Sequence, residues 1–257
     1  MRTPIFILAL VAGAAMSGES GALDASGETV GVNPDAEASG AGGLRTIEIK
    51  GPIFMGDVIT TDLKGQVQIL FVDDTKFIVG ANSKVTIDAF VFDADKTAQD
   101  VSISAVKGAF RFITGNSPKQ NYTIKTPTMT IGVRGTAFDL AVRPGIGEST
   151  LLTHEGLTDV CDVIRRCMEG NAGSMVVGGT DGIRSVPAGQ ERRQRLNAFF
   201  PLLRDQSTIL TGFTVEAPPE ISAGSDGASG YDDGDTDHTP PSPPSPPAEP
   251  PPDGTHR

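Results

Sequence analysis

The chain has 257 residues and a net charge of −11, with 32 acidic residues against 21 Lys and Arg. This balance excludes the broad basic surface that a nucleic-acid-binding protein needs. It also makes binding to an anionic membrane unfavourable. The 31 glycines and the absence of Trp are typical of a turn-rich β protein whose apolar residues are mainly Val, Ile and Phe.

The N-terminus has the layout of a secretory signal peptide. A short basic start, Met1-Arg2-Thr3-Pro4, precedes an uncharged and mostly apolar run over 5–16, and small residues follow up to Ala22. This run is too short to span a bilayer, which takes about 20 residues. We therefore predict a signal peptide over 1–22, cleaved after Ser17 or Ala22, and an exported protein that is periplasmic or extracellular. A buried helix or an uncleaved anchor is the alternative.

Residues 23–43 contain few large apolar side chains. Such a segment buries too little surface to offset the entropy lost on ordering. We expect a flexible leader here.

Alternation with a period of two marks the body of the chain. Val67, Ile69 and Phe71 alternate with other residues, and the same pattern returns in later segments: 85–91, 101–103, 110–112, 122–124 and 138–142. Turn residues such as Lys107-Gly108 separate these segments. The pattern predicts an all-β domain of stacked strands over 44–190, either a β-solenoid or a sandwich.

A C-terminal extension over 191–215 follows this domain. Within 44–188 no segment has the pattern of a long helix, so a parallel βαβ fold is not expected. The stretch from Gln190 to Leu203 is the one helix candidate, and Pro201 should end it.

The segment 124–138, IKTPTMTIGVRGTAF, carries the most specific motif of the chain. It resembles the signature "i-x-T-P-x-a-x-x-g-v-R-G-T-x-F" of the FecR domain family. Weaker likenesses come from GDVITT at 56–61, GQVQILFVDDT at 65–75 and VKGAFRF at 106–112. Asp74 departs from the family's "D-G-T" turn, but Asp tolerates a left-handed backbone.

The signature supplies six candidate site residues. They belong either to the fold signature or to a partner contact: Thr126, Pro127, Arg134, Gly135, Thr136 and Phe138. Pro127 restricts its own φ and keeps the preceding residue extended, while Gly135 permits a turn or a close approach. For Arg134 two readings stay open: a guanidinium that holds strand ends or a carboxylate, and a contact to a partner.

The resemblance implies a binding or signalling role. Family members include regulators of sigma factors that carry a cytoplasmic helical region and a transmembrane helix before a periplasmic FecR domain. Because this sequence shows neither piece, we expect a stand-alone exported module that binds an envelope protein and has no stable membrane span after signal cleavage. The alternative is a structural or adhesive surface protein that binds an envelope polymer.

Two cysteines, Cys161 and Cys167, lie close together in a chain expected to be exported. This spacing predicts a disulfide across a hairpin turn. A C-x5-C pair alone is a poor zinc site, and the usual enzyme motifs, including G-x-S-x-G and the P-loop, are absent. We therefore predict a non-enzymatic protein without a metal or cofactor, and we expect His154 to lie in a turn.

The chain changes character at Glu216. Residues 216–257 carry nine acidic residues and one basic residue, and they end in a proline-rich run. This composition predicts a disordered, partly polyproline-II tail that acts as a spacer or binds a partner.

Overall fold

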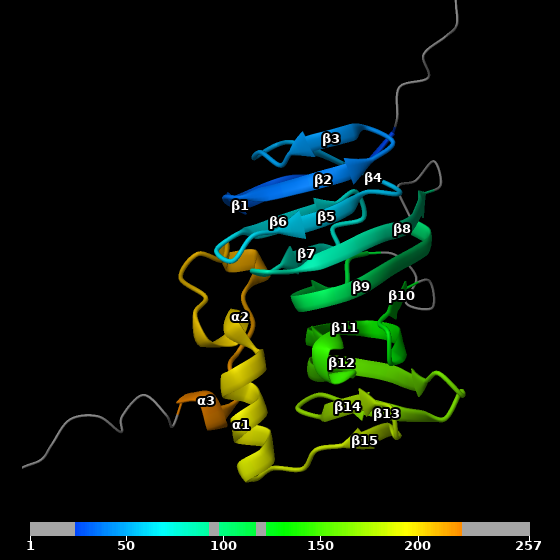
Figure 1. The fold of residues 1–257 in the computed structure, drawn as a ribbon, viewed down its shortest axis with the longest axis vertical. Coiled ribbons are helices and arrows are strands. Elements are labelled where there is room, and N and C mark those ends of the chain that lie inside the picture. Colours follow the sequence, from blue (N-terminus) through cyan, green and yellow to red (C-terminus); the bar gives the residue numbers. More distant parts are fainter. Residues whose placement is uncertain (1–23, 93–97, 117–121, 223–257) are drawn as a thin grey trace, which may run out of the picture. The chain divides into compact units, whose positions relative to one another are not determined.

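A computed structural model describes residues 24–92, 98–116 and 122–222, and within them one 15-stranded sheet folds into two layers (Figure 1). The predicted signal peptide lies outside the described residues. The all-β prediction is confirmed. Of the two predicted arrangements, the structure has the sandwich-like one, with two layers that share three long strands. All described residues belong to one compact unit.

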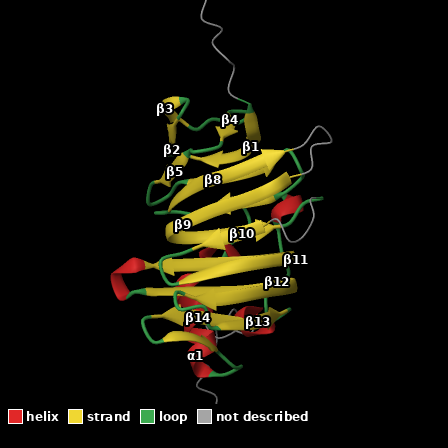
Figure 2. Cartoon of the chain, turned by 90° about the vertical axis from the view of Figure 1, so that its right-hand side faces the viewer, coloured by secondary structure: helices red, strands yellow, loops and turns green. Residues whose placement is uncertain are grey.

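Each layer has six strands of its own and shares three more with the other layer. The first layer contains β2 (Ala36–Gly40), β3 (Gly43–Thr46), β5 (Val58–Thr61), β8 (Lys84–Phe92), β10 (Tyr122–Lys125) and β13 (Cys167–Asn171). The second contains β1 (Ala25–Asn33), β4 (Pro52–Phe54), β6 (Gln66–Phe71), β7 (Lys76–Val79), β14 (Met175–Gly179) and β15 (Gly182–Ser185). The shared strands are β9 (Ala98–Ile113), β11 (Met129–Arg143) and β12 (Glu148–Asp162). Figure 2 shows β8 to β12 stacked in chain order.

The three shared strands pass between layers by bending at glycines. Gly108 in β9, Gly135 in β11 and Gly156 in β12 have φ of 113°, 68° and 73°, which a residue with a side chain rarely adopts. A Cβ at Gly156 would also lie 2.0 Å from the carbonyl oxygen of Gly135. The sequence pattern at Lys107-Gly108 predicts a turn between strands, but the structure has a corner inside one continuous strand.

The main core lies between the layers and contains the predicted alternating residues. Val67, Ile69 and Phe71 are buried there, as are the apolar residues of β10 and β11. One alternation fails, because β8 has a register shift after Ile87 that turns Phe90 into the core in place of its neighbour Ala89.

Strands replace the predicted flexible leader. Residues 25–40 form β1 and β2, and β1 pairs with both β4 and β6. Small residues can enter a sheet when their neighbours supply the apolar surface: Ala36 and Ala38 are buried in the main core. The domain therefore begins well before residue 44.

The C-terminal extension covers the outer face of the second layer. The predicted helix is present as α1 (Gln190–Phe199), and Pro201 starts the short helix α2 (Pro201–Arg204). The remaining helices are η2 (Pro144–Ile146), η3 (Thr211–Phe213) and α3 (Pro219–Ser222). Ile221 packs on the cluster beneath α1, so the tail prediction is wrong for 216–222, and 223–257 lie outside the described residues. None of the helices in the described ranges is long and apolar enough to cross a membrane.

Candidate interaction site

Thr126 and Pro127 form the turn that leads into β11. The Thr126 hydroxyl accepts hydrogen bonds from the backbone N–H of Thr128 at 3.2 Å and of Met129 at 3.0 Å. It also accepts one from Ser149 Oγ at 3.0 Å, which joins the turn to the first residues of β12. These contacts are those of a turn-stabilising threonine.

The other four signature residues lie at or beside the β11 corner. Gly135 forms the bend, Thr136 is buried next to it, and Phe138 stacks on Phe112 in the main core with ring centroids 5.4 Å apart. Arg134 is exposed and forms an ion pair with Asp159 on the neighbouring strand, with 2.7 Å between Nη2 and Oδ2. Of the six residues, Arg134 therefore offers the most accessible functional group.

The disulfide prediction is confirmed: Cys161 in β12 is bonded to Cys167 in β13. The two cysteines face each other in the strand register, and the five residues between them form the end of a hairpin. We call residues 162–166 the hairpin tip. A loop this short gains about 2 kcal/mol of stability from its cross-link in the chain-entropy model.

The Asp162 carboxylate also stabilises the hairpin tip, through hydrogen bonds. One carboxylate oxygen accepts hydrogen bonds from the backbone N–H of Ile164 at 3.0 Å and of Arg166 at 2.8 Å. The other accepts one from Arg166 Nε at 2.7 Å. Although burial alone would raise the pKa of Asp162, the bonds from Arg166 and Ile164 lower it below its ordinary value.

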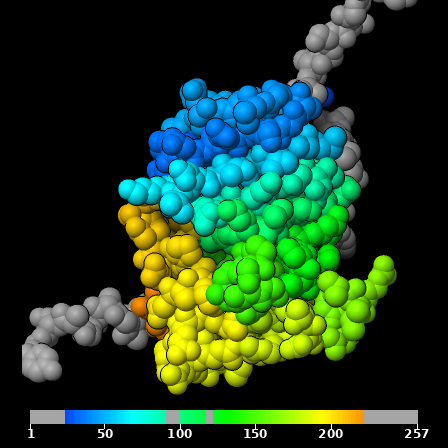
Figure 3. Space-filling model, in the orientation of Figure 1, coloured from blue at the N-terminus to red at the C-terminus, as the bar shows by residue number. Residues whose placement is uncertain are grey.

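The hairpin tip presents apolar side chains to solvent. Val163 is 74% exposed and Ile164 68%, whereas most residues of this type in the domain are buried. Arg165 follows with φ of 63° and has no ion pair with another described residue. The yellow-green segment that contains the tip protrudes from the body (Figure 3). Exposed apolar residues on a rigid protrusion are typical of a protein contact site.

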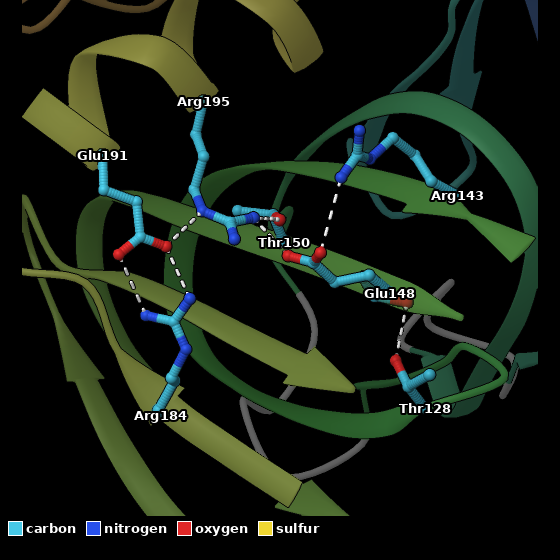
Figure 4. A network of polar contacts seen from close by, with 8 residues as sticks. Thr128, Arg143, Glu148, Thr150, Arg184, Glu191 and Arg195 are labelled. Carbon is cyan, nitrogen blue, oxygen red and sulfur yellow. Dashed lines mark hydrogen bonds and ion pairs between the residues drawn. The ribbon is translucent and has the colours of Figure 1, made fainter. Parts of the chain in front are cut away.

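A polar network fixes α1 to the sheet (Figure 4). Glu191 on α1 accepts hydrogen bonds from Arg184 of β15 and from Arg195, and these bonds lower its pKa to about 2. Arg195 also pairs with Glu148, which lies 3.4 Å from Arg143 Nη2. Residues far apart in the sequence thus meet around one helix.

The sequence analysis missed a buried ion pair behind the second layer. Arg111 is fully buried, and its Nε and Nη2 donate to the Asp139 carboxylate at 2.6 and 2.8 Å. His154 is in strand β12 and not in a turn, with Nε2 3.4 Å from Asp139 Oδ1. Burial would raise the pKa of Asp139, but Arg111 and His154 together lower it.

The described residues do not gather into a metal-binding site. In the ranges that the structure describes, no group of three or more His, Cys, Asp or Glu residues could hold a metal ion. The Arg111–Asp139 pair is enclosed by α2 and η3, so its contacts are those of a fold-stabilising pair.

Comparisons with known proteins found distant structural likenesses and one family match. Two crystal structures of a "putative anti-sigma factor" from Parabacteroides distasonis, at 1.65 and 2.50 Å resolution, are 14% identical to the chain with a TM-score of 0.41. Each aligns with 55% of this chain, which spans only 64% and 63% of theirs. These likenesses are too distant to assign a function, and no curated protein matches. The model of the FecR protein family matches residues 57–157. These residues are therefore similar to a FecR domain, and they contain the central strands of both layers, from β5 into β12.

Proposed function

We propose that this chain is an extracytoplasmic binding and sensing module of the FecR type, which works through protein–protein contacts in the cell envelope. The family match supports a signalling or sensing role. The disulfide supports a location outside the cytoplasm, because such bonds persist mainly in oxidising compartments.

The observation that carries the proposal is the hairpin tip. Val163 and Ile164 are exposed at the end of a hairpin that a disulfide and the Asp162 carboxylate both hold rigid. A preorganised apolar contact loses little conformational entropy on binding, so two such side chains can anchor a partner.

Co-purification from an envelope extract tests this function. The full mature chain should retain a defined protein in a saturable manner, and the double variant Val163→Ser/Ile164→Ser should retain at least tenfold less. Leu63→Ser is the matched control, because Leu63 is also 74% exposed but lies in a turn of the N-terminal half. Failure of the unmodified chain to retain any reproducible protein would contradict the proposed function, as would equal recovery by the double variant.

A further inference from the structure

The hairpin tip packs against the turn between β14 and β15. Arg166 Nη2 donates a hydrogen bond to the carbonyl oxygen of Asp181 at 3.1 Å. Gly182 has φ of 106°, and a Cβ there would lie 1.9 Å from the same Arg166 nitrogen. The tip and this turn are therefore in direct contact.

The same turn lines a cavity of about 280 Å³, whose other walls come from the β11–β12 connection, β15 and α1. Its lining includes Ile146, Glu148, Asp181, Gly182, Arg184 and Arg195. Ile146 is itself 58% exposed. Since Asp181 and Gly182 contact the tip and line the cavity, the tip and the cavity form one continuous surface.

This surface is cationic in an acidic protein. It holds four arginines (165, 166, 184 and 195) and three acids (148, 162 and 181), so four minus three leaves a charge of +1, while the whole chain carries −11. Arg184 Nε and Arg195 Nη2 have no hydrogen bond to another described residue.

We propose that the hairpin tip and this cavity form one docking surface for a protein segment that carries acidic side chains beside large apolar side chains. The apolar side chains contact Val163 and Ile164, and the acidic side chains pair with Arg165 and with the free donor of Arg184. This inference rests on the proposed function and specifies the chemistry of the partner.

An anionic membrane fits this surface less well than an acidic protein segment. Outside these seven charged residues the chain has a charge of −12, which repels a negatively charged bilayer at close range. A protein segment contacts only the local cationic surface, where complementary charge favours association.

Selection from a displayed library of random 12-residue peptides tests the inference on the full chain with its disulfide intact. We expect enrichment of peptides with Asp or Glu next to large apolar residues. A synthetic copy of the best peptide should bind at least tenfold more weakly to Ile164→Ser and to Arg184→Gln. Leu63→Ser and Arg193→Gln, both exposed substitutions elsewhere, should bind it normally.

Two further measurements keep the outcome independent of variant folding. The same peptide with Asn and Gln in place of its acids should bind the unmodified chain at least tenfold more weakly, and vesicles of phosphatidylglycerol and phosphatidylcholine at 150 mM salt should not bind. No selected peptide, no acid preference, or vesicle binding that Ile164→Ser abolishes would each overturn the inference. If an envelope protein still co-purifies through the tip, the proposed function stands and only the partner chemistry is wrong.

Discussion

The buried Arg111 allows a quantitative prediction. Substituting Arg111 by Met leaves the Asp139 carboxylate, which is 1% exposed, without its two charged hydrogen-bond donors. It also removes the donor to Gln206 Oε1 and to the carbonyl oxygens of Leu202 and Phe213. Removing one member of a buried ion pair costs about 3–5 kcal/mol.

The pH dependence of this cost follows from the sign of the pKa shift. The pKa of Asp139 is held below its ordinary value of 3.8, so the pair contributes stability above pH 3.8 that is lost as the pH falls through the lowered pKa. In Arg111→Met the buried carboxyl instead takes up a proton. Protonating a group of pKa 3.8 costs about 4 kcal/mol at pH 7 but only about 1 kcal/mol at pH 4.5.

Urea unfolding of the full chain, followed by circular dichroism at pH 7 and pH 4.5, measures the loss of stability at both pH values. Arg193→Met on the exposed side of α1 is the control and should change the free energy of unfolding by less than about 0.5 kcal/mol. The double variant Arg111→Met/Asp139→Leu should recover part of the loss, because it leaves no unpaired charge. A loss below about 1 kcal/mol at pH 7, or an equal loss at both pH values, would refute this reasoning.

Three other predictions concern the corner, the disulfide and the polar network. Gly156→Ala should destabilise the chain by more than about 2 kcal/mol in the same urea titration, because the added Cβ clashes and φ is unfavourable. Gly173→Ala is the control: its φ is 80° but the space around it is open, so it should cost about 1–2 kcal/mol. Replacing Cys161 and Cys167 by Ser should lower the free energy of unfolding by about 2 kcal/mol, and an unchanged value would contradict the chain-entropy account. Glu191→Gln should destabilise the chain at pH 7, and the difference from the unmodified protein should shrink as the pH falls from about 4.5 towards 2 in thermal unfolding; a constant difference would mean that the carboxylate is not paired in solution.

Sequence patterns predicted the elements that depend on local chemistry. Alternation placed Val67 and Phe71 in the core, proline placed the end of α1, and the cysteine spacing predicted the cross-link. The leader was mispredicted because Ala36 and Ala38 bury little surface themselves and are held in place by neighbouring strands.

The candidate site was only half predictable. Cysteine spacing located the hairpin, but the contact between Arg166 and Asp181 depends on strands that meet only in the folded sheet. The same holds for the Arg184–Glu191 pair, which joins β15 to α1. One sequence alone does not predict which exposed turns contact each other in the folded protein.

Alternation alone does not predict the burial of Arg111. Arg111 stands between Phe110 and Phe112, and a period of two assigns it to a solvated face. The chain does carry a signal that this face is covered, because Phe77-Ile78-Val79 and Met175-Val176-Val177 are continuous apolar runs of the kind found in strands buried on both sides. Their outward residues Ile78 and Val177 meet the C-terminal extension. A polar residue opposite such runs must then find its partner inside the protein, so an arginine on that face predicts a buried carboxylate beside it.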